Sequence, residues 1–205
     1  LSDNNHCLQA SVLMALDSHG IKLSWDEVDK LTKYDVNFYS WTAVGAMVLA
    51  KFIPGVKFMS RMDYPEFSKR GEDYLKEYWQ NDKDHYELQK KGASMNFIKE
   101  QNISRNLVKN NIYENKDISV KDFDDFLEKY FIITLVNTSE LYQNNYKGSH
   151  FIFIFDQTKT DFIFHDPGLP PVESCHISKD RYIKEIFVSD TILITVTPLP
   201  TTSNA

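Results

Sequence analysis

The sequence predicts one α+β domain, in which N-terminal helices pack on a C-terminal antiparallel β-sheet. Helical hydrophobic periodicity occupies most of the first 130 residues, and short apolar runs separated by polar turns occupy the rest. Helices followed by strands are typical of the α+β class. A chain of 205 residues suits a single domain (1–205) that carries one sizeable insertion. Its 42% hydrophobic and 25% charged residues are usual for globular proteins and exclude disordered and collagen-like chains.

Three helices are expected before residue 55, and each is marked by its ends. The polar residues 3–5 can accept hydrogen bonds at the start of the first helix, and Gly20 can end it. Ser24 and Glu27 have the order and spacing of a capping box for the second helix. The expected elements are a helix from Cys7, a helix from Ser24 to Leu31, a helix from Trp41 to Phe52 ended by Pro54 and Gly55, and a short strand at Val56–Met59.

Residues 64 to 117 predict a helical insertion on one side of the core. The segment is charged, and it carries more aromatic residues at helical spacing than a solvated linker requires. Two interpretations stay open at this point: the insertion covers part of the core, or part of it walls the cleft beside Cys7 and narrows substrate choice. The aromatic residues concerned are Tyr74, Tyr78, Trp79 and Tyr86.

The last third of the chain predicts mainly β-structure. An amphipathic helix comes first, with Phe123, Phe126 and Leu127 on one face. The continuous apolar run that follows is typical of a buried strand, and two further runs joined by a polar turn are typical of a hairpin. The expected elements are a helix from Ser119 to Tyr130 and strands at Phe131–Asn137, His150–Phe155, Phe162–His165 and Thr191–Val196.

Charge and composition restrict the classes of function. A formal net charge of −6, with lysines scattered among acidic residues, argues against a nucleic-acid binder. No apolar run approaches the roughly 18–20 residues that a membrane span needs. No glycine-rich phosphate loop or dinucleotide fingerprint is present, so no cofactor is predicted. The chain begins at Leu1, which predicts that a segment precedes it and leaves both a cytoplasmic and a secreted location open.

Cys7 is the first candidate for chemistry. At a helix N-terminus a thiolate faces unpaired backbone N–H groups and the positive end of the helix dipole, and both lower the pKa of a thiol. An adjacent imidazole would complete an activated nucleophile. The alternative is a buried helix cysteine without chemistry. A single disulfide between Cys7 and Cys175 also stays open.

His150 and Asp166 are the second and third candidates, because the predicted hairpin brings them together. His150 follows a glycine turn and opens a buried strand. If the turn is centred near residues 158 and 159, His150 faces residue 166 or 167, and directly opposed Cβ atoms lie about 4.5–5.5 Å apart. A carboxylate there would fix the tautomer of the imidazole and stabilise the imidazolium. The alternatives are a strand-edge histidine and a simple Asp-Pro-Gly turn.

The order of these candidates resembles a known family. A cysteine on the first helix, a helix-then-strand unit, and a hairpin with a histidine at one end and an aspartate at the other are similar to the bacteriocin-processing (double-glycine leader) peptidases. These belong to the papain-like cysteine peptidase superfamily. The resemblance covers at most about half of the chain. It is carried by Cys7–Met14, Phe123–Asn137, Gly148–Phe151 and Phe164–Gly168.

The resemblance implies a papain-like fold and a thiol hydrolase that cleaves peptide or amide bonds through Cys7, His150 and Asp166. Two features depart from the family. Leu8 and Gln9 follow the cysteine where the family has Gly-Pro, and Leu1 occupies the position of its oxyanion glutamine. Asn4 or Asn5 is the expected substitute, and a donor upstream of Leu1 is the alternative. Losing one oxyanion donor typically costs about 10²–10³ in rate, so weak or altered activity also stays open. The alternatives are an acyl transferase of the same fold and a catalytically inactive peptide-binding module.

Other histidines and cysteines weigh less. Cys175 and His176 are expected on a loop, and His165 should point away from Asp166 on its strand. A zinc site that used His165 with the three triad candidates would need four converging ligands, and no Cys-x-x-Cys pair supports one. No metal is predicted.

Overall fold

A single seven-stranded sheet organises the computed structural model, which describes residues 5–93, 97–145 and 148–196. The strand order is β2-β1-β7-β3-β4-β5-β6. Only the β1–β2 pair is parallel among these strands, and every other neighbouring pair is antiparallel. The described chain is therefore a mixed α/β structure. The strands are β1 (Lys57–Ser60), β2 (Tyr113–Asn115), β3 (Tyr130–Asn137), β4 (Ser149–Gln157), β5 (Asp161–Asp166), β6 (Val172–Ser178) and β7 (Phe187–Thr195).

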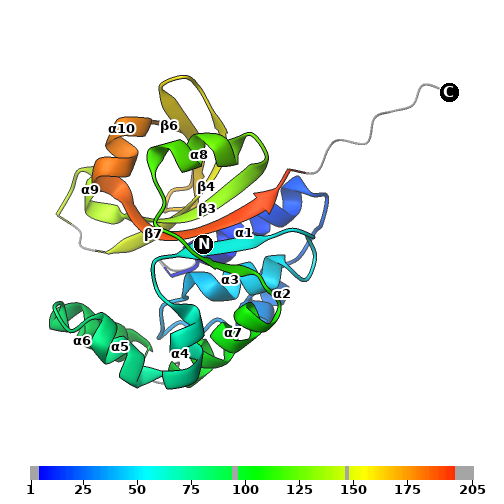
Figure 1. Cartoon of the computed structure of the whole chain (residues 1–205). Helices are drawn as coiled ribbons and strands as arrows, with labels where there is room; N and C mark the ends of the chain where they lie inside the picture. Colours follow the sequence, from blue (N-terminus) through cyan, green and yellow to red (C-terminus); the bar gives the residue numbers. More distant parts are fainter. Residues whose placement is uncertain (1–4, 94–96, 146–147, 197–205) are drawn as a thin grey trace.

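The first three helices form the layer on one face of the sheet (Figure 1). They are α1 (Cys7–Ser18), α2 (Trp25–Thr32) and α3 (Thr42–Leu49). The predicted capping box of Ser24 and Glu27 is present. The third helix is shorter than predicted at both ends, but α1 begins at Cys7 as the sequence predicts.

Gly45 allows α3 to approach both α1 and the sheet closely. A Cβ atom added at this position would lie 2.9 Å from Cδ1 of Leu8 and 3.2 Å from Cδ1 of Ile192. A larger residue would therefore separate the helix from its neighbours. This close packing holds α1 firmly against the sheet, where it also contacts β4.

A second apolar layer covers the opposite face of the sheet. Phe123 packs edge-on against Tyr182, with ring centroids 5.3 Å apart, and Phe162 contacts both rings. Ser119 and Asp122 form a second capping box at the start of α8. The elements of this layer are α8 (Val120–Leu127), α9 (Thr138–Tyr142), α10 (Lys179–Arg181) and the π-helical turn η1 (Tyr182–Ile186).

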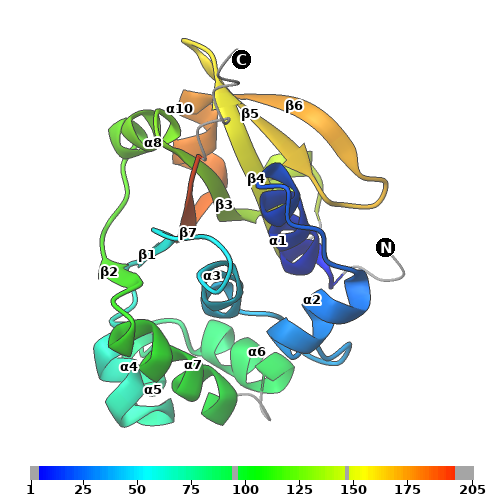
Figure 2. The same cartoon turned by 90° about the vertical axis from the view of Figure 1, so that its right-hand side faces the viewer.

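The segment from 64 to 117 is largely helical, as predicted. Its helices gather beyond α3, on the side away from β6 (Figure 2). The prediction missed its final strand, β2, which pairs with β1 and joins the main sheet. Its helices are α4 (Tyr64–Arg70), α5 (Glu72–Tyr78), α6 (Lys83–Ala93) and α7 (Phe97–Lys109).

Two further features bear on the sequence analysis. Cys175 and His176 lie on β6 and not on a loop, and both cysteines are free. In the described part of the chain, no helix has the length and apolar character to cross a membrane.

Candidate active site

Cys7 is the first residue of α1, so its sulfur lies at a helix N-terminus. His6 is the N-cap residue, and its carbonyl oxygen accepts the first helical hydrogen bond, from the N–H of Ala10 at 2.9 Å. No side chain of the described residues caps this end. The side chain of Cys7 is half-buried. The start of α1 thus places the half-buried sulfur of Cys7 beside backbone N–H groups that no described side chain caps.

His150 lies near the start of β4 and links the other two predicted residues. Its Nε2 is 2.7 Å from Oδ1 of Asp166, and the side chain of Cys7 lies near enough to the imidazole to raise its pKa. Because Nε2 is hydrogen-bonded to the carboxylate of Asp166, Nδ1 is the ring nitrogen available to interact with the sulfur of Cys7. His150 is 9% exposed. The structure thus brings Cys7, His150 and Asp166 together at one place.

Asp166 accepts hydrogen bonds on both carboxylate oxygens. Oδ1 accepts from His150 and from the backbone N–H of Gly168, each at 2.7 Å. Oδ2 accepts from the hydroxyl of Tyr142 at 2.6 Å. The residue is 5% exposed, and a buried carboxylate needs such donors to remain charged.

The hairpin register differs from the predicted one, although the predicted contact forms. Phe153 pairs with His165, so Asp166 would face Ile152 and not His150. A bulge between Ile154 and Asp156 contributes to this difference. His150 and Asp166 are instead diagonal neighbours on the same face of the sheet, and their side chains bridge the extra spacing.

The electrostatics of the site favour a charged histidine. Burial alone would lower the pKa of His150, but the hydrogen bonds and negative charges of Asp166 and Cys7 outweigh burial and raise it to about 9. Burial also opposes ionisation of Asp166, yet the hydrogen bonds from His150 and Tyr142, with the charge of His150, lower the pKa of this carboxyl. The arrangement therefore favours an imidazolium at His150 beside an ionised Asp166.

Sequence reasoning missed Tyr142, which lies at the end of α9 in the connection between β3 and β4. Its ring centroid is 6.1 Å from that of His150. Neither periodicity nor a motif marks this tyrosine. The usable signal was positional: the connection must return to the end of the sheet at which His150 begins its strand.

The expected oxyanion donors have different outcomes. Asn4 lies outside the described residues. Asn5 is described, and its amide donates a hydrogen bond to the carbonyl oxygen of Val36 at 3.1 Å. This contact ties the start of α1 to the loop that follows α2. The assignment of Asn5 to an oxyanion site stays a prediction.

His6, the neighbour of Cys7, is anchored away from the thiol. Its Nε2 lies 3.2 Å from Oδ2 of Asp29 on α2, and its ring packs against Tyr34 with centroids 3.8 Å apart. These contacts fix the residue that precedes Cys7. They also leave the histidine ring engaged with α2 and its following loop.

His165 and Cys175 lie outside the triad contacts. His165 stacks on Phe155 with ring centroids 4.3 Å apart, and its Nδ1 accepts from the backbone N–H of Ser174 at 3.2 Å. Its strand neighbours alternate in burial, so it faces away from Asp166. Among the described residues, no group of three or more His, Cys, Asp or Glu side chains is placed to hold a metal ion.

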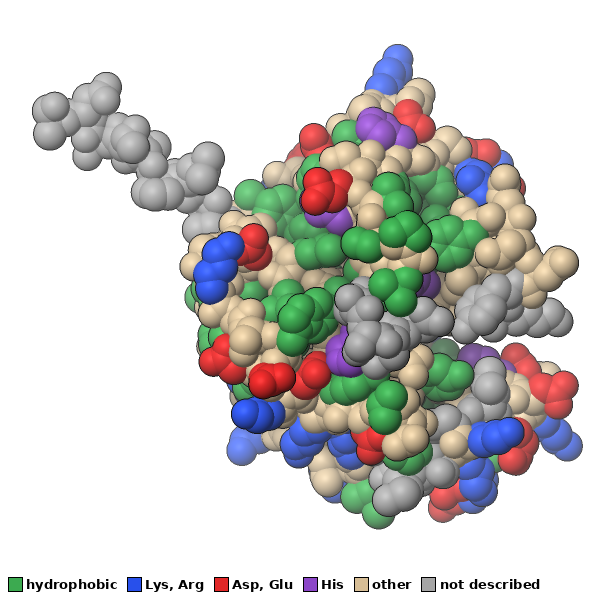
Figure 3. All heavy atoms as spheres, turned by 180° about the vertical axis from the view of Figure 1, so that it is seen from behind, with side chains coloured by type: hydrophobic (Ala, Val, Ile, Leu, Met, Phe, Trp, Pro, Cys, Tyr) green, Lys and Arg blue, Asp and Glu red, His purple; other side chains and the backbone are tan. Residues whose placement is uncertain are grey.

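Two helices of the insertion, α5 and α6, lie on the same side of the molecule as α9 (Figure 1). In Figure 1, α5 and α6 lie below α9 at the same edge of the molecule, and Figure 3 shows a notch at the corresponding edge from behind. Trp79 of the insertion packs against Trp41 at the start of α3, with ring centroids 6.3 Å apart. The role of the insertion as a wall of the substrate cleft stays a prediction.

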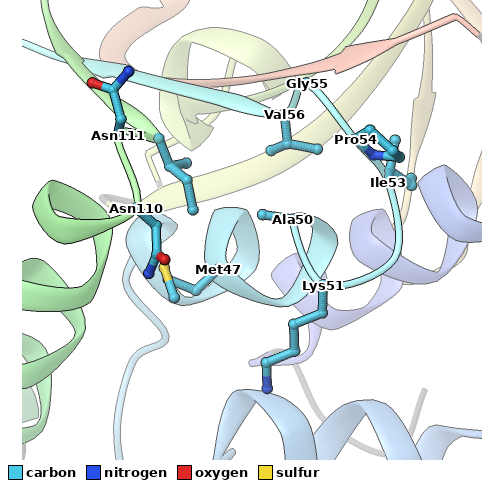
Figure 4. Close-up of a pocket in the computed structure, with 10 residues that line it drawn as sticks. Met47, Ala50, Lys51, Ile53, Pro54, Gly55, Val56, Asn110 and Asn111 are labelled. Atoms are coloured by element: carbon cyan, nitrogen blue, oxygen red, sulfur yellow. The ribbon is translucent and has the colours of Figure 1, made fainter.

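A separate cavity of about 640 Å³ lies between the end of α3, β1 and the end of α7 (Figure 4). Met47, Ala50 and Val56 give it apolar walls, and Asn110 and Asn111 line another side. Thr195 adjoins Gly55 of this cavity and pairs with Tyr130, at the end of β3 opposite to His150. The cavity is therefore distinct from the triad.

A scan against models of known protein families and a search of curated proteins found no match to this chain.

Proposed function

We propose that this chain is a papain-like thiol hydrolase that cleaves peptide or amide bonds. The observation that carries the proposal is the position of His150, which lies beside Cys7 and is hydrogen-bonded to Asp166 at 2.7 Å. This is the arrangement in which a histidine activates a nucleophile and a carboxylate orients the histidine. It uses one residue from the helical layer and two from the sheet.

In the first half of the reaction, the thiolate of Cys7 attacks the carbonyl carbon of the scissile bond. The resulting tetrahedral intermediate collapses, the C–N bond breaks, and the imidazolium of His150 donates its Nδ1 proton to the leaving amine. The acyl group remains on the sulfur as a thioester. Asp166 stays ionised throughout and holds Nε2 of the ring.

In the second half, neutral His150 accepts a proton from water while the water oxygen attacks the thioester carbonyl. The C–S bond breaks, the carboxylic acid leaves, and the thiolate–imidazolium pair is restored. If an amine replaced water in this step, the same residues would perform acyl transfer. Product analysis with added amine acceptors distinguishes the two outcomes.

The negative charge on the tetrahedral oxygen would be stabilised at the start of α1. The backbone N–H of Cys7 and the positive end of the helix dipole both lie there, and no described side chain caps them. A second donor from Asn4 or Asn5 belongs to the same proposal. Part of the insertion would form the opposite wall of the substrate cleft.

The test compares the two free cysteines in the native protein. Iodoacetamide reacts with thiolates, so Cys7 should be labelled much faster than Cys175 at about pH 6 to 7. Burial and the nearby charge of Asp166 raise the pKa of Cys175, which makes it a slow internal reference. His150→Ala should slow labelling of Cys7 and leave Cys175 unchanged.

Equal labelling of the two cysteines in the folded wild-type protein would reject the proposal. It would instead favour a peptide-binding module without catalytic activity. Labelling is measured on separate peptides, which assigns each label to Cys7 or Cys175. Slow labelling of Cys7 then cannot be hidden by labelling of Cys175.

A further inference from the structure

We infer that Tyr142 is a positioning residue of this site, which acts through Asp166 by donating a hydrogen bond to its outer carboxylate oxygen. The inference rests on the proposed function and extends it by one residue. The contact joins the hydroxyl of Tyr142 and Oδ2 of Asp166 at 2.6 Å. Tyr142 belongs to α9, an element that carries none of the three triad candidates.

Tyr142 matters because the hydrogen-bond donors are divided between the two carboxylate oxygens of Asp166. His150 and the backbone of Gly168 both donate to Oδ1. Within the described part of the chain, Tyr142 supplies the hydrogen bond to Oδ2. Without it, a charged oxygen of a residue that is 5% exposed would lose its partner. The carboxylate would then rotate towards water and carry Oδ1 away from His150.

The surroundings of Gly168 show how tightly the groups around Asp166 are packed. A Cβ atom added to Gly168 would lie 2.9 Å from Oδ1 of Asp166 and 2.9 Å from the hydroxyl oxygen of Tyr142. The two side chains and the backbone of the turn therefore converge on one point. Such convergence holds the plane of the carboxylate more tightly than a single contact would.

Tyr142 also limits the access of water to the ion pair. Its side chain is 42% exposed, so one part of the ring faces solvent while the hydroxyl reaches the buried carboxylate. Burial and the negative charge of Asp166 raise the pKa of this hydroxyl, which keeps it protonated and able to donate across the neutral range. A less hydrated carboxylate interacts more strongly with the imidazolium.

The experiment is a double-mutant cycle between Tyr142→Phe and Asp166→Asn. The rate of Cys7 labelling by iodoacetamide is measured across pH for the wild type, both single variants and the double variant. Tyr142→Phe keeps the ring and removes only the hydroxyl. Tyr130→Phe is the matched control, because Tyr130 lies at the opposite end of β3. Urea unfolding of each variant checks that the fold is retained.

Tyr142→Phe should slow labelling at pH 6 about 10-fold and raise the pH of half-maximal labelling by about one unit, since a hydrogen bond to a charged group contributes about that much. In the Asp166→Asn background it should change the rate less than about 2-fold, because its target is already altered. Tyr130→Phe should match the wild type. A role in stability alone would not move the pH of half-maximal labelling.

Two results would overturn the inference: an unchanged pH profile in Tyr142→Phe, or the same fold-change in both backgrounds. Failure of the proposed function is separable, because it would appear in the wild type as Cys7 labelling no faster than Cys175. A wild type with fast, His150-dependent labelling and an unaffected Tyr142→Phe variant would reject the role of Tyr142 alone.

Discussion

Glu100 should make the stability of this protein fall as pH rises from 4.5 to about 7. It lies on α7, is 1% exposed, and its Oε2 is buried without a hydrogen-bond partner in the described residues. Burial raises the pKa of this carboxyl to about 7, and the positive charge of Lys99 offsets only part of the effect. The ordinary value of 4.5 applies once the chain unfolds.

The sign of the effect follows from the proton balance. Between pH 4.5 and about 7 the folded protein keeps the proton on Glu100 and the unfolded chain loses it, so rising pH favours unfolding. Below 4.5 both states are protonated, and above about 7 both are ionised. With about 1.4 kcal/mol for each pKa unit, the total loss is about 3 kcal/mol.

Glu100→Gln should remove this dependence. Its free energy of unfolding relative to wild type should rise by about 3 kcal/mol between about pH 4 and pH 8. The assay is urea unfolding at several pH values, followed by the fluorescence of Trp41 and Trp79, which pack against each other beside α7. Glu87→Gln, at an exposed position on α6, is the matched control and should show no such trend. A difference between Glu100→Gln and wild type that is constant across pH would refute the reasoning.

Three predictions concern the candidate active site. Asp166→Asn should reduce turnover of an activated ester or amide by about 10- to 10³-fold, because an amide favours the wrong tautomer of His150, whereas His165→Ala, on the other face of β5, should change turnover little. Turnover of the wild type should fall above about pH 9, where His150 loses the proton that the leaving amine needs; a plateau to pH 10 would contradict this. Gly168→Ala should slow Cys7 labelling, because the added methyl group displaces Asp166; labelling at the wild-type rate would contradict the tight packing of that turn.

Local signals in the sequence were sufficient for the elements that depend on local chemistry. The capping box at Ser24 predicted α2, and the apolar spacing after Cys7 predicted α1. The strand β2 was missed because its three residues gain their structure only by pairing with β1, far away in the chain. The edge strand β6 was missed because it is mostly exposed and carries no apolar alternation.

The candidate site was likewise predicted where local signals exist and missed where the structure depends on distant parts of the chain. The sequence predicted that Cys7, His150 and Asp166 meet, and the structure joins His150 to Asp166 by a hydrogen bond and places Cys7 near the imidazole. It misjudged the hairpin register, because a bulge is an irregularity that alternation cannot reveal. It missed Tyr142, whose contribution depends on the path of a loop through space.

The placement of Cys7 on the first described helix has a consequence for folding. Its two partners in the proposed site belong to β4 and β5, so the three residues come from segments that are far apart in the sequence. During synthesis the N-terminal helices emerge before β4 and β5. At that stage the thiol of Cys7 has no imidazole beside it. If the proposed function is correct, Cys7 becomes reactive only once β4 and β5 are in place beside α1. The rate at which Cys7 becomes reactive to thiol labelling therefore measures the long-range step of folding in which β4 and β5 pack beside α1.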